Sequence, residues 1–183
     1  MSNGKLIIIS GPSGTGKGTV LAEVFKSNPH LVYSVSATTR APRNGEQHGV
    51  QYFFITREEF ETKIQRNEML EYAEYCNNYY GTPADFVALQ RSMGKDVILE
   101  IEADGAMQVM KKCPDAVSLF ILPPSMEELE RRLSSRGTED ADVVAARIAK
   151  AREEIKKAPL YDYQMVNDDV KSAALKINQI IKK

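Results

Sequence analysis

The chain has 183 residues, of which 43% are hydrophobic and 27% are charged. This composition is typical of one globular domain and argues against a disordered tail or a multidomain array. The 24 basic residues face 25 acidic ones, so neither nucleic acid nor a membrane is expected as a partner, because both favour a basic face. Only two cysteines occur, Cys76 and Cys113, and the first apolar run is too short for a signal peptide. We therefore expect a cytoplasmic protein.

A glycine-rich segment follows the first apolar run. Leu6–Ile9 is predicted to be a buried parallel strand, and the helix after it is predicted at Gly16–Lys26. The segment between them fits the pattern G-x-x-x-x-G-K: Gly11, Pro12, Ser13, Gly14, Thr15, Gly16, Lys17. Glycines let backbone N–H groups converge on a phosphate at the helix N-terminus, and the lysine adds a cation. This pattern predicts a binding site for the phosphates of a nucleoside triphosphate. The alternative interpretation of the segment is a flexible turn between strand and helix.

The residue after this lysine departs from the usual pattern. Most such loops carry Ser or Thr there to contact Mg²⁺, but this chain has Gly18, and its first hydroxyl is that of Thr19. Either Thr19 assists the metal, or Mg²⁺ is held by water and by the phosphates of the nucleotide, which suits its reluctance to lose its hydration shell.

A second candidate phosphate site follows the next predicted strand, Leu31–Val35. Arg40 and Arg43 flank a proline turn and have no acidic residue directly beside them. Arginine can direct two hydrogen bonds at one phosphate, and a pair of arginines could neutralise a dianion. The alternative is a pair of solvated surface arginines.

The segment that follows mixes strand and helix patterns. Alternation over Val50–Ile55 predicts a strand, and Thr56 with Glu59 forms a capping box before a helix. Thr82 is predicted to cap a further helix that has Pro83 at its first position and that ends at Gly94.

The rest of the chain alternates between strand and helix patterns. Strands are predicted at Val97–Leu99, Val117–Leu122 and Gln164–Val166, and helices at Ala103–Lys112 and Val170–Ile181. This alternation indicates an α/β fold with a parallel sheet. The segment from residue 125 to 157 is instead a highly charged pair of helices, which we interpret as a mobile cover. Two carboxylates, Glu100 and Glu102, follow a predicted strand at the edge where α/β sheets bind ligands.

Seven motifs in this order resemble those of guanylate kinases over almost the whole chain. They are G-P-S-G-T-G-K at 11–17, S-x-T-T-R-x-P-R at 36–43, G-x-x-Y at 49–52, N-Y-Y-G-T at 78–82, E-I-E at 100–102, R-x-x-x-R-G at 132–137 and V-N-D-D at 166–169. The resemblance implies a single domain with a three-layer P-loop kinase core formed by residues 1–35, 93–124 and 158–183. It further implies a mixed α+β GMP-binding subdomain at 36–92 and a helical lid at 125–157.

The resemblance also implies roles for the matching residues. ATP would be bound by the loop residues Gly11, Pro12, Ser13, Gly14, Thr15, Gly16, Lys17, Gly18 and Thr19, together with Arg132, Asn167 and Asp168. The phosphate of GMP would be held by Arg40, Arg43, Tyr52 and Tyr80, its guanine would be read by Ser36, Glu71 and Thr82, and Glu100 would lie near it. The catalytic residues would be Lys17, Arg40, Arg136 and Arg147. Mg²⁺ would enter with ATP, with Thr19 as the candidate contact.

The chemistry of guanine agrees with this assignment. Guanine presents N1–H and an amino group side by side, so that one carboxylate, Glu71, can accept from both, whereas adenine would present an acceptor at N1. An unpaired buried group of this kind costs about 1–3 kcal/mol. For Glu71 taken alone, the alternative is a solvated side chain in an acidic stretch.

The implied reaction is transfer of the γ-phosphoryl group of ATP to GMP, and also to dGMP, giving ADP and the nucleoside diphosphate for guanine nucleotide synthesis and recycling. The acceptor phosphate is already anionic, so that no general base is required. Three alternatives stay open: a monophosphate kinase for another base, a P-loop kinase for another small molecule, and a non-catalytic module of the same fold that holds phosphorylated peptides. The intact phosphate loop disfavours the module. Both a monomer and a homo-oligomer are compatible with the sequence.

Overall fold

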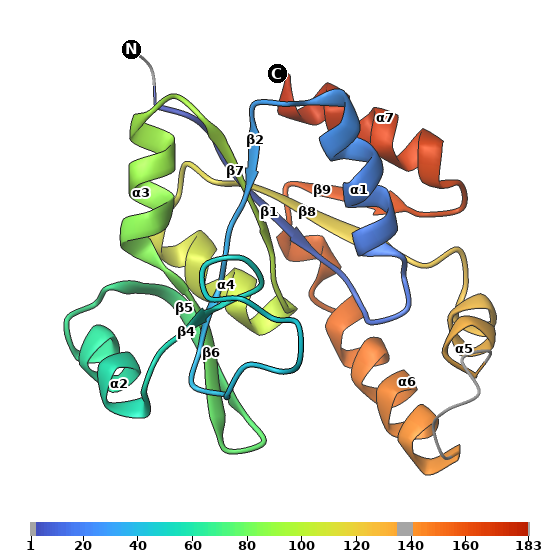
Figure 1. The fold of residues 1–183 in the computed structure, drawn as a ribbon. Coiled ribbons are helices and arrows are strands. Elements are labelled where there is room, and N and C mark those ends of the chain that lie inside the picture. Colours follow the sequence, from blue (N-terminus) through green and yellow to red (C-terminus); the bar gives the residue numbers. More distant parts are fainter. Residues whose placement is uncertain (1–2, 135–140, 183) are drawn as a thin grey trace. The chain divides into compact units, whose positions relative to one another are not determined.

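The computed structural model describes residues 3–134 and 141–182 and contains two sheets (Figure 1). The larger is a parallel sheet whose five strands lie in the order β2 (Leu31–Tyr33), β7 (Asp96–Glu100), β1 (Leu6–Ser10), β8 (Val117–Leu122) and β9 (Tyr163–Val166). All five residues of β1 are buried, as expected for a central strand covered on both faces. The prediction of an α/β fold with a parallel sheet is confirmed.

The smaller sheet is mixed. Its strands lie in the order β4 (Phe53–Phe54), β3 (Ala37–Thr38), β6 (Asn78–Pro83) and β5 (Met69–Tyr75). The pair β3 and β4 is parallel, whereas β6 is antiparallel to both of its neighbours. The strand predicted over residues 50–55 is shorter than expected, because regular pairing is confined to Phe53 and Phe54.

Seven α-helices and one short 3₁₀ helix lie within the described residues. They are α1 (Lys17–Ser27), α2 (Arg57–Gln65), α3 (Ala84–Ser92), α4 (Ala103–Lys112), α5 (Met126–Ser134), α6 (Ala141–Ile155), α7 (Val170–Ile181) and the 3₁₀ helix η1 (Ala158–Leu160). The capping box predicted at α2 is confirmed: Thr56 Oγ1 accepts from the backbone N–H of Glu59 at 3.1 Å, and the Glu59 carboxylate accepts from the backbone N–H of Thr56 at 2.7 Å.

The predicted start of α3 is wrong by one residue. Pro83 is the N-cap and Ala84 the first helical residue, whereas Thr82 still belongs to β6. The physical reason is competition for the Thr82 hydroxyl, which donates to the Glu71 carboxylate at 2.7 Å instead of capping the helix. Gly94 ends the helix as predicted, with a positive φ of 74° and a bond from its N–H to the Arg91 carbonyl.

The chain divides into two compact units. The first unit comprises the residues up to Leu6, Val32–Leu99 and Asp104–Ala116, and the second comprises Ile7–Leu31, Glu100–Ala103 and the residues from Val117 onward. A cluster of Ala37, Phe60 and Met69 forms a core in the first unit. In the second unit, Leu129 and Leu133 of α5 pack against Ala151 of α6. No helix among the described residues is long and apolar enough to cross a membrane.

Candidate functional site

The phosphate loop joins β1 to α1 in the second unit, and two of its glycines are required by geometry. At Gly11, a Cβ atom would lie 2.2 Å from the carbonyl oxygen of Ile121 in β8, so that any side chain would collide with the backbone. Gly16 is the N-cap of α1 and has a left-handed φ of 85°, which other residues adopt at a cost. The glycine pattern therefore reflects close strand packing as well as backbone conformation.

The Lys17 side chain folds back over this loop. Its ammonium group donates to the carbonyls of Gly11 at 2.5 Å and Pro12 at 3.0 Å. Burial lowers the pKa of Lys17, while the carboxylates of Glu100 and Glu154 oppose that shift. The amine is thus held beside the backbone N–H groups at the start of α1, where an anion would be stabilised by the helix N-terminus.

Asn167 supports the loop from the end of β9. It is only 3% exposed, and its side-chain amide donates to the Thr15 carbonyl at 2.7 Å. Its own backbone N–H donates to the carbonyl of Leu122 at 2.9 Å. Within the described part of the chain, the Asn167 side-chain oxygen has no hydrogen-bond partner. The next residue, Asp168, is exposed and accepts from the backbone N–H of Asp169 at 2.8 Å.

Two side chains of α6 reach this site. Arg147 donates to the Ser13 hydroxyl of the phosphate loop at 2.6 Å. Lys150 forms an ion pair of 2.9 Å with Glu102, which follows β7, and lies 3.9 Å from Glu154. The structure therefore brings the predicted Arg147 together with the loop, and it adds Lys150, which the sequence alone gave no reason to select.

In α5, the arginines are held within the helix. Arg132 donates to Glu128 at 2.8 Å, and Arg131 binds the same carboxylate with two bonds of 2.7 Å. These contacts lower the pKa of Glu128 to about 2. The predicted Arg136 lies outside the described residues.

In the first unit, two of the three predicted base-reading residues, Glu71 and Thr82, lie on one hairpin, formed by β5 and β6. Its two-residue turn, Cys76 and Asn77, has positive φ angles of 48° and 60°, as in a type I′ turn. This turn sets the register that places Glu71 opposite Thr82. Glu71 is only 7% exposed, and its Oε1 atom accepts from the Thr82 hydroxyl at 2.7 Å.

Gly105 of α4 lies against this carboxylate. A Cβ atom at position 105 would stand 2.8 Å from Glu71 Oε2, so the helix approaches Glu71 because residue 105 has no side chain. Ser36 precedes β3 and is half-buried, and its carbonyl accepts from the Phe53 N–H at 2.8 Å.

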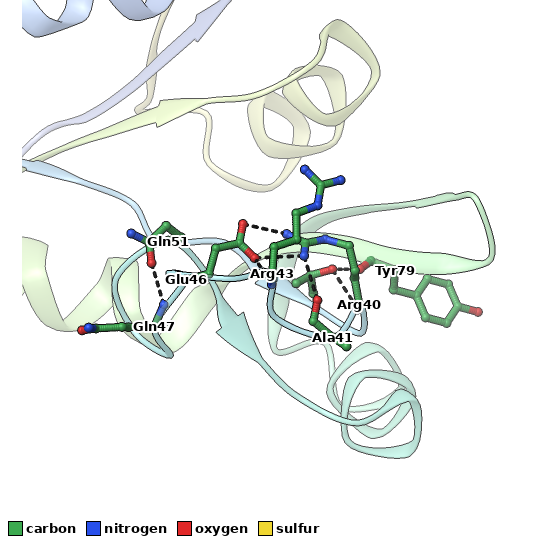
Figure 2. Close-up of polar contacts among 8 residues, drawn as sticks. Arg40, Ala41, Arg43, Glu46, Gln47, Gln51 and Tyr79 are labelled. Atoms are coloured by element: carbon green, nitrogen blue, oxygen red, sulfur yellow. Dashed lines mark hydrogen bonds and ion pairs between the residues drawn. The ribbon is translucent and has the colours of Figure 1, made fainter.

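The arginine loop differs from expectation, because an acid does lie beside the arginines. Glu46 accepts from both terminal amino groups of Arg40, at 2.9 and 3.0 Å, and from the backbone N–H of Arg43 at 2.7 Å (Figure 2). The Arg40 guanidinium also lies 5.6 Å from the centre of the Tyr52 ring, which meets Tyr80 edge to face at 6.1 Å. The structure thus brings Arg40, Tyr52 and Tyr80 together and links the Arg43 backbone to Arg40 through Glu46, a residue that the sequence prediction missed.

A sequence signal for Glu46 existed. It stands three residues after Arg43, the spacing at which the glutamate of a capping box accepts from the backbone N–H three residues earlier. Pairing with Arg40, six residues earlier, depends on how the loop folds back and has no fixed spacing.

The parallel sheet, with a G-x-x-x-x-G-K loop leading from its central strand into a helix, defines a nucleotide-binding protein of the P-loop class. The guanylate kinase family model matches residues 3–183. The chain is 54% identical to the guanylate kinase of Lactococcus lactis over 97% of its own length and 87% of that protein, and 56% identical to that of Streptococcus pneumoniae over 97% and 86%.

Among solved structures, guanylate kinase from Anaplasma phagocytophilum matches with a TM-score of 0.75 and 36% identity, covering 100% of this chain and 86% of that one. The chain therefore belongs to the guanylate kinase family, and guanylate kinase activity is its function. The family resemblance and the expected class of enzyme, a nucleotide-binding transferase, are confirmed.

Proposed function

We propose that the protein transfers the γ-phosphoryl group of ATP to GMP and dGMP, releasing ADP and the nucleoside diphosphate. The observation that carries this proposal is the buried Glu71 carboxylate held by Thr82, in a chain that also has an intact phosphate loop. The Glu71 carboxylate has the acceptor chemistry that guanine requires, and the phosphate loop has the geometry that a triphosphate requires.

ATP would bind to the loop from Gly11 to Thr19. The backbone N–H groups at the start of α1 would receive the phosphates, and Lys17 would turn from its loop carbonyls toward them. Asn167 and Asp168 would border the adenine. Arg147, which already reaches Ser13, would stabilise the charge of the transferring group with Arg132 and Arg136. We assign residues 125–157 as the lid that carries these arginines.

GMP would bind in the subdomain of residues 36–92. Arg43 and Arg40 would receive its phosphate, with the hydroxyls of Tyr52 and Tyr80 beside them. Glu71 would accept from the guanine N1–H and amino group, while Ser36 and Thr82 would contact the base, and Glu100 would lie near the acceptor. Because the phosphate of GMP is anionic at neutral pH, the enzyme needs positioning and charge neutralisation rather than a general base.

Mg²⁺ is expected to enter with ATP. The space beside the end of the loop is open, because a Cβ atom at Gly18 would meet nothing within 4 Å, and the neighbouring Thr19 is exposed. A hydrated ion fits such a place, and Thr19 is the residue that could contact it. Bound Mg²⁺ would neutralise charge on the phosphates.

One assay tests the proposal. ADP release is measured with ATP, Mg²⁺ and each of GMP, dGMP, AMP, CMP and UMP, with Lys17→Ala as the inactive control. We expect turnover with GMP and dGMP to exceed that with the other acceptors. Equal rates with AMP would contradict the guanine site, and no turnover with any acceptor would favour a non-catalytic binding module. We place the enzyme in the cytoplasm, an inference supported by its two free cysteines.

A further inference from the structure

Glu46 joins the two arginines of the proposed GMP phosphate site into one network. Its Oε2 atom accepts from Arg40 Nη1 at 2.9 Å and from the backbone N–H of Arg43 at 2.7 Å, and its Oε1 atom accepts from Arg40 Nη2 at 3.0 Å. In return, the backbone N–H of Glu46 donates to the Arg43 carbonyl at 3.0 Å. The Glu46 and Arg40 side chains are only 19% and 16% exposed. A fork with two parallel bonds is both the strong and the geometrically specific form of such a pair.

Glu46 contacts the two arginines through different groups. Arg40 is held by its guanidinium, which also donates to the Ala41 carbonyl at 2.7 Å and lies 5.6–5.7 Å from the ring centres of Tyr52 and Phe54. Glu46 contacts Arg43 at its backbone N–H, and the Arg43 side chain extends away from Glu46 (Figure 2). Glu46 therefore orients the guanidinium of Arg40 but contacts only the backbone of Arg43.

This arrangement allows the Arg40 guanidinium to bind two anions at once, the Glu46 carboxylate and a phosphate. A guanidinium has five N–H donors, of which Glu46 uses two and the Ala41 carbonyl uses a third. A phosphate oxygen can therefore bind Arg40 while the ion pair stays in place. The pair also keeps both groups charged, since Glu46 raises the pKa of Arg40 and Arg40 lowers the pKa of Glu46.

We propose that Glu46 is a positioning residue for GMP, which acts by holding Arg40 and the Arg43 backbone in the phosphate-binding arrangement before the nucleotide arrives. Such preorganisation strengthens binding because the ordering cost is met during folding. The proposal rests on the proposed function and names a residue that acts through Arg40 without touching the substrate.

The test compares Glu46→Gln with Glu61→Gln. Glu61 is a matched control, because it is also a carboxylate paired with an arginine of the first unit, Arg57, at 3.0 Å. Glutamine keeps the shape of Glu46 but can offer Arg40 only one oxygen. We expect Glu46→Gln to raise the KM for GMP and the calorimetric Kd for GMP about tenfold, consistent with loss of a charged fork. The kcat and the KM for ATP should change little, and Glu61→Gln should match the parent protein in all of these.

A double-mutant cycle tests the route of the effect. In an Arg40→Ala background, Glu46→Gln should lower kcat/KM for GMP much less than in the parent protein, because the partner through which it acts is gone. Equal effects in both backgrounds would refute the proposal, as would an unchanged GMP Kd. A tighter Kd would show instead that Glu46 competes with the phosphate for Arg40.

Two checks separate other causes. Thermal unfolding identifies a variant that is merely destabilised, and Glu46→Asp, which keeps the charge but shortens the reach, should weaken GMP binding by an intermediate amount. If the parent protein itself does not phosphorylate GMP, the proposed function fails. If the parent is active and Glu46→Gln binds GMP as tightly as the parent does, only the role of Glu46 fails.

Discussion

Replacing Glu71 by glutamine should remove the preference for guanine. The Glu71 carboxylate is 7% exposed, and Thr82 occupies one acceptor position on Oε1 at 2.7 Å. A carboxylate has about four lone-pair sites, so that accepting from the guanine N1–H and amino group is within its capacity. Glutamine would keep one of these bonds and point its NH₂ group at the other guanine donor.

The size of the effect follows from two terms. A hydrogen bond to a charged group contributes about 1.5–3 kcal/mol, and a buried donor left unsatisfied costs about 1–3 kcal/mol. Together they amount to about 2.5–6 kcal/mol, which corresponds to a fall in kcat/KM for GMP of about 60- to 20,000-fold.

The assay compares GMP with IMP, which lacks the exocyclic amino group. The parent protein should prefer GMP by about 10- to 100-fold, the value of one charged hydrogen bond. In Glu71→Gln that ratio should fall to about one or below, because IMP removes the donor that faces the new NH₂ group. Glu74→Gln is the matched control, since Glu74 is an exposed acid of the same strand paired with Arg57. The reasoning is refuted if Glu71→Gln retains both the parental kcat/KM and the parental GMP to IMP ratio.

Four further predictions concern the phosphate loop and the start of α1. Gly11→Ala places a Cβ atom 2.2 Å from the Ile121 carbonyl, so we expect a lower Tm and weak ATP binding by calorimetry; a parental Tm would contradict the packing argument. Gly18→Ala should instead keep or raise the Tm, with a gain in the free energy of unfolding of up to about 1 kcal/mol, because the position is helical and open. Gly18→Ser should lower the Mg²⁺ concentration needed for half-maximal turnover, and an unchanged requirement would mean that the hydroxyl does not reach the ion. Lys17→Ala should cut turnover by orders of magnitude with the Tm retained, and near-normal rates would exclude its catalytic role.

Local sequence patterns were sufficient to predict several structural elements of this protein. The buried run of β1, the glycine loop and the capping box of α2 each depend on residues close together in the chain, and each was predicted at nearly its observed place. Backbone conformation and short-range hydrogen bonding govern such features, so a few neighbouring residues determine them. The strand over Phe53–Phe54 was overestimated, because strand length depends on the partner strand and not on alternation alone.

The hairpin of β5 and β6 carried little local signal, since its turn is Cys76-Asn77 rather than the usual Asn-Gly or Asp-Gly pair.

By itself, the sequence determined the fold class, the family and the phosphate loop, because these rest on composition, periodicity and motifs of fixed spacing. Only the tertiary structure decided which distant side chains meet. It paired Thr82 with Glu71 rather than with the helix it precedes, Lys150 with Glu102, and Arg40 with Glu46. Each of these contacts depends on strand register or on how a loop or helix packs, and hydrogen bonds and ion pairs form between groups that folding brings within about 3 Å, whatever their separation in the chain.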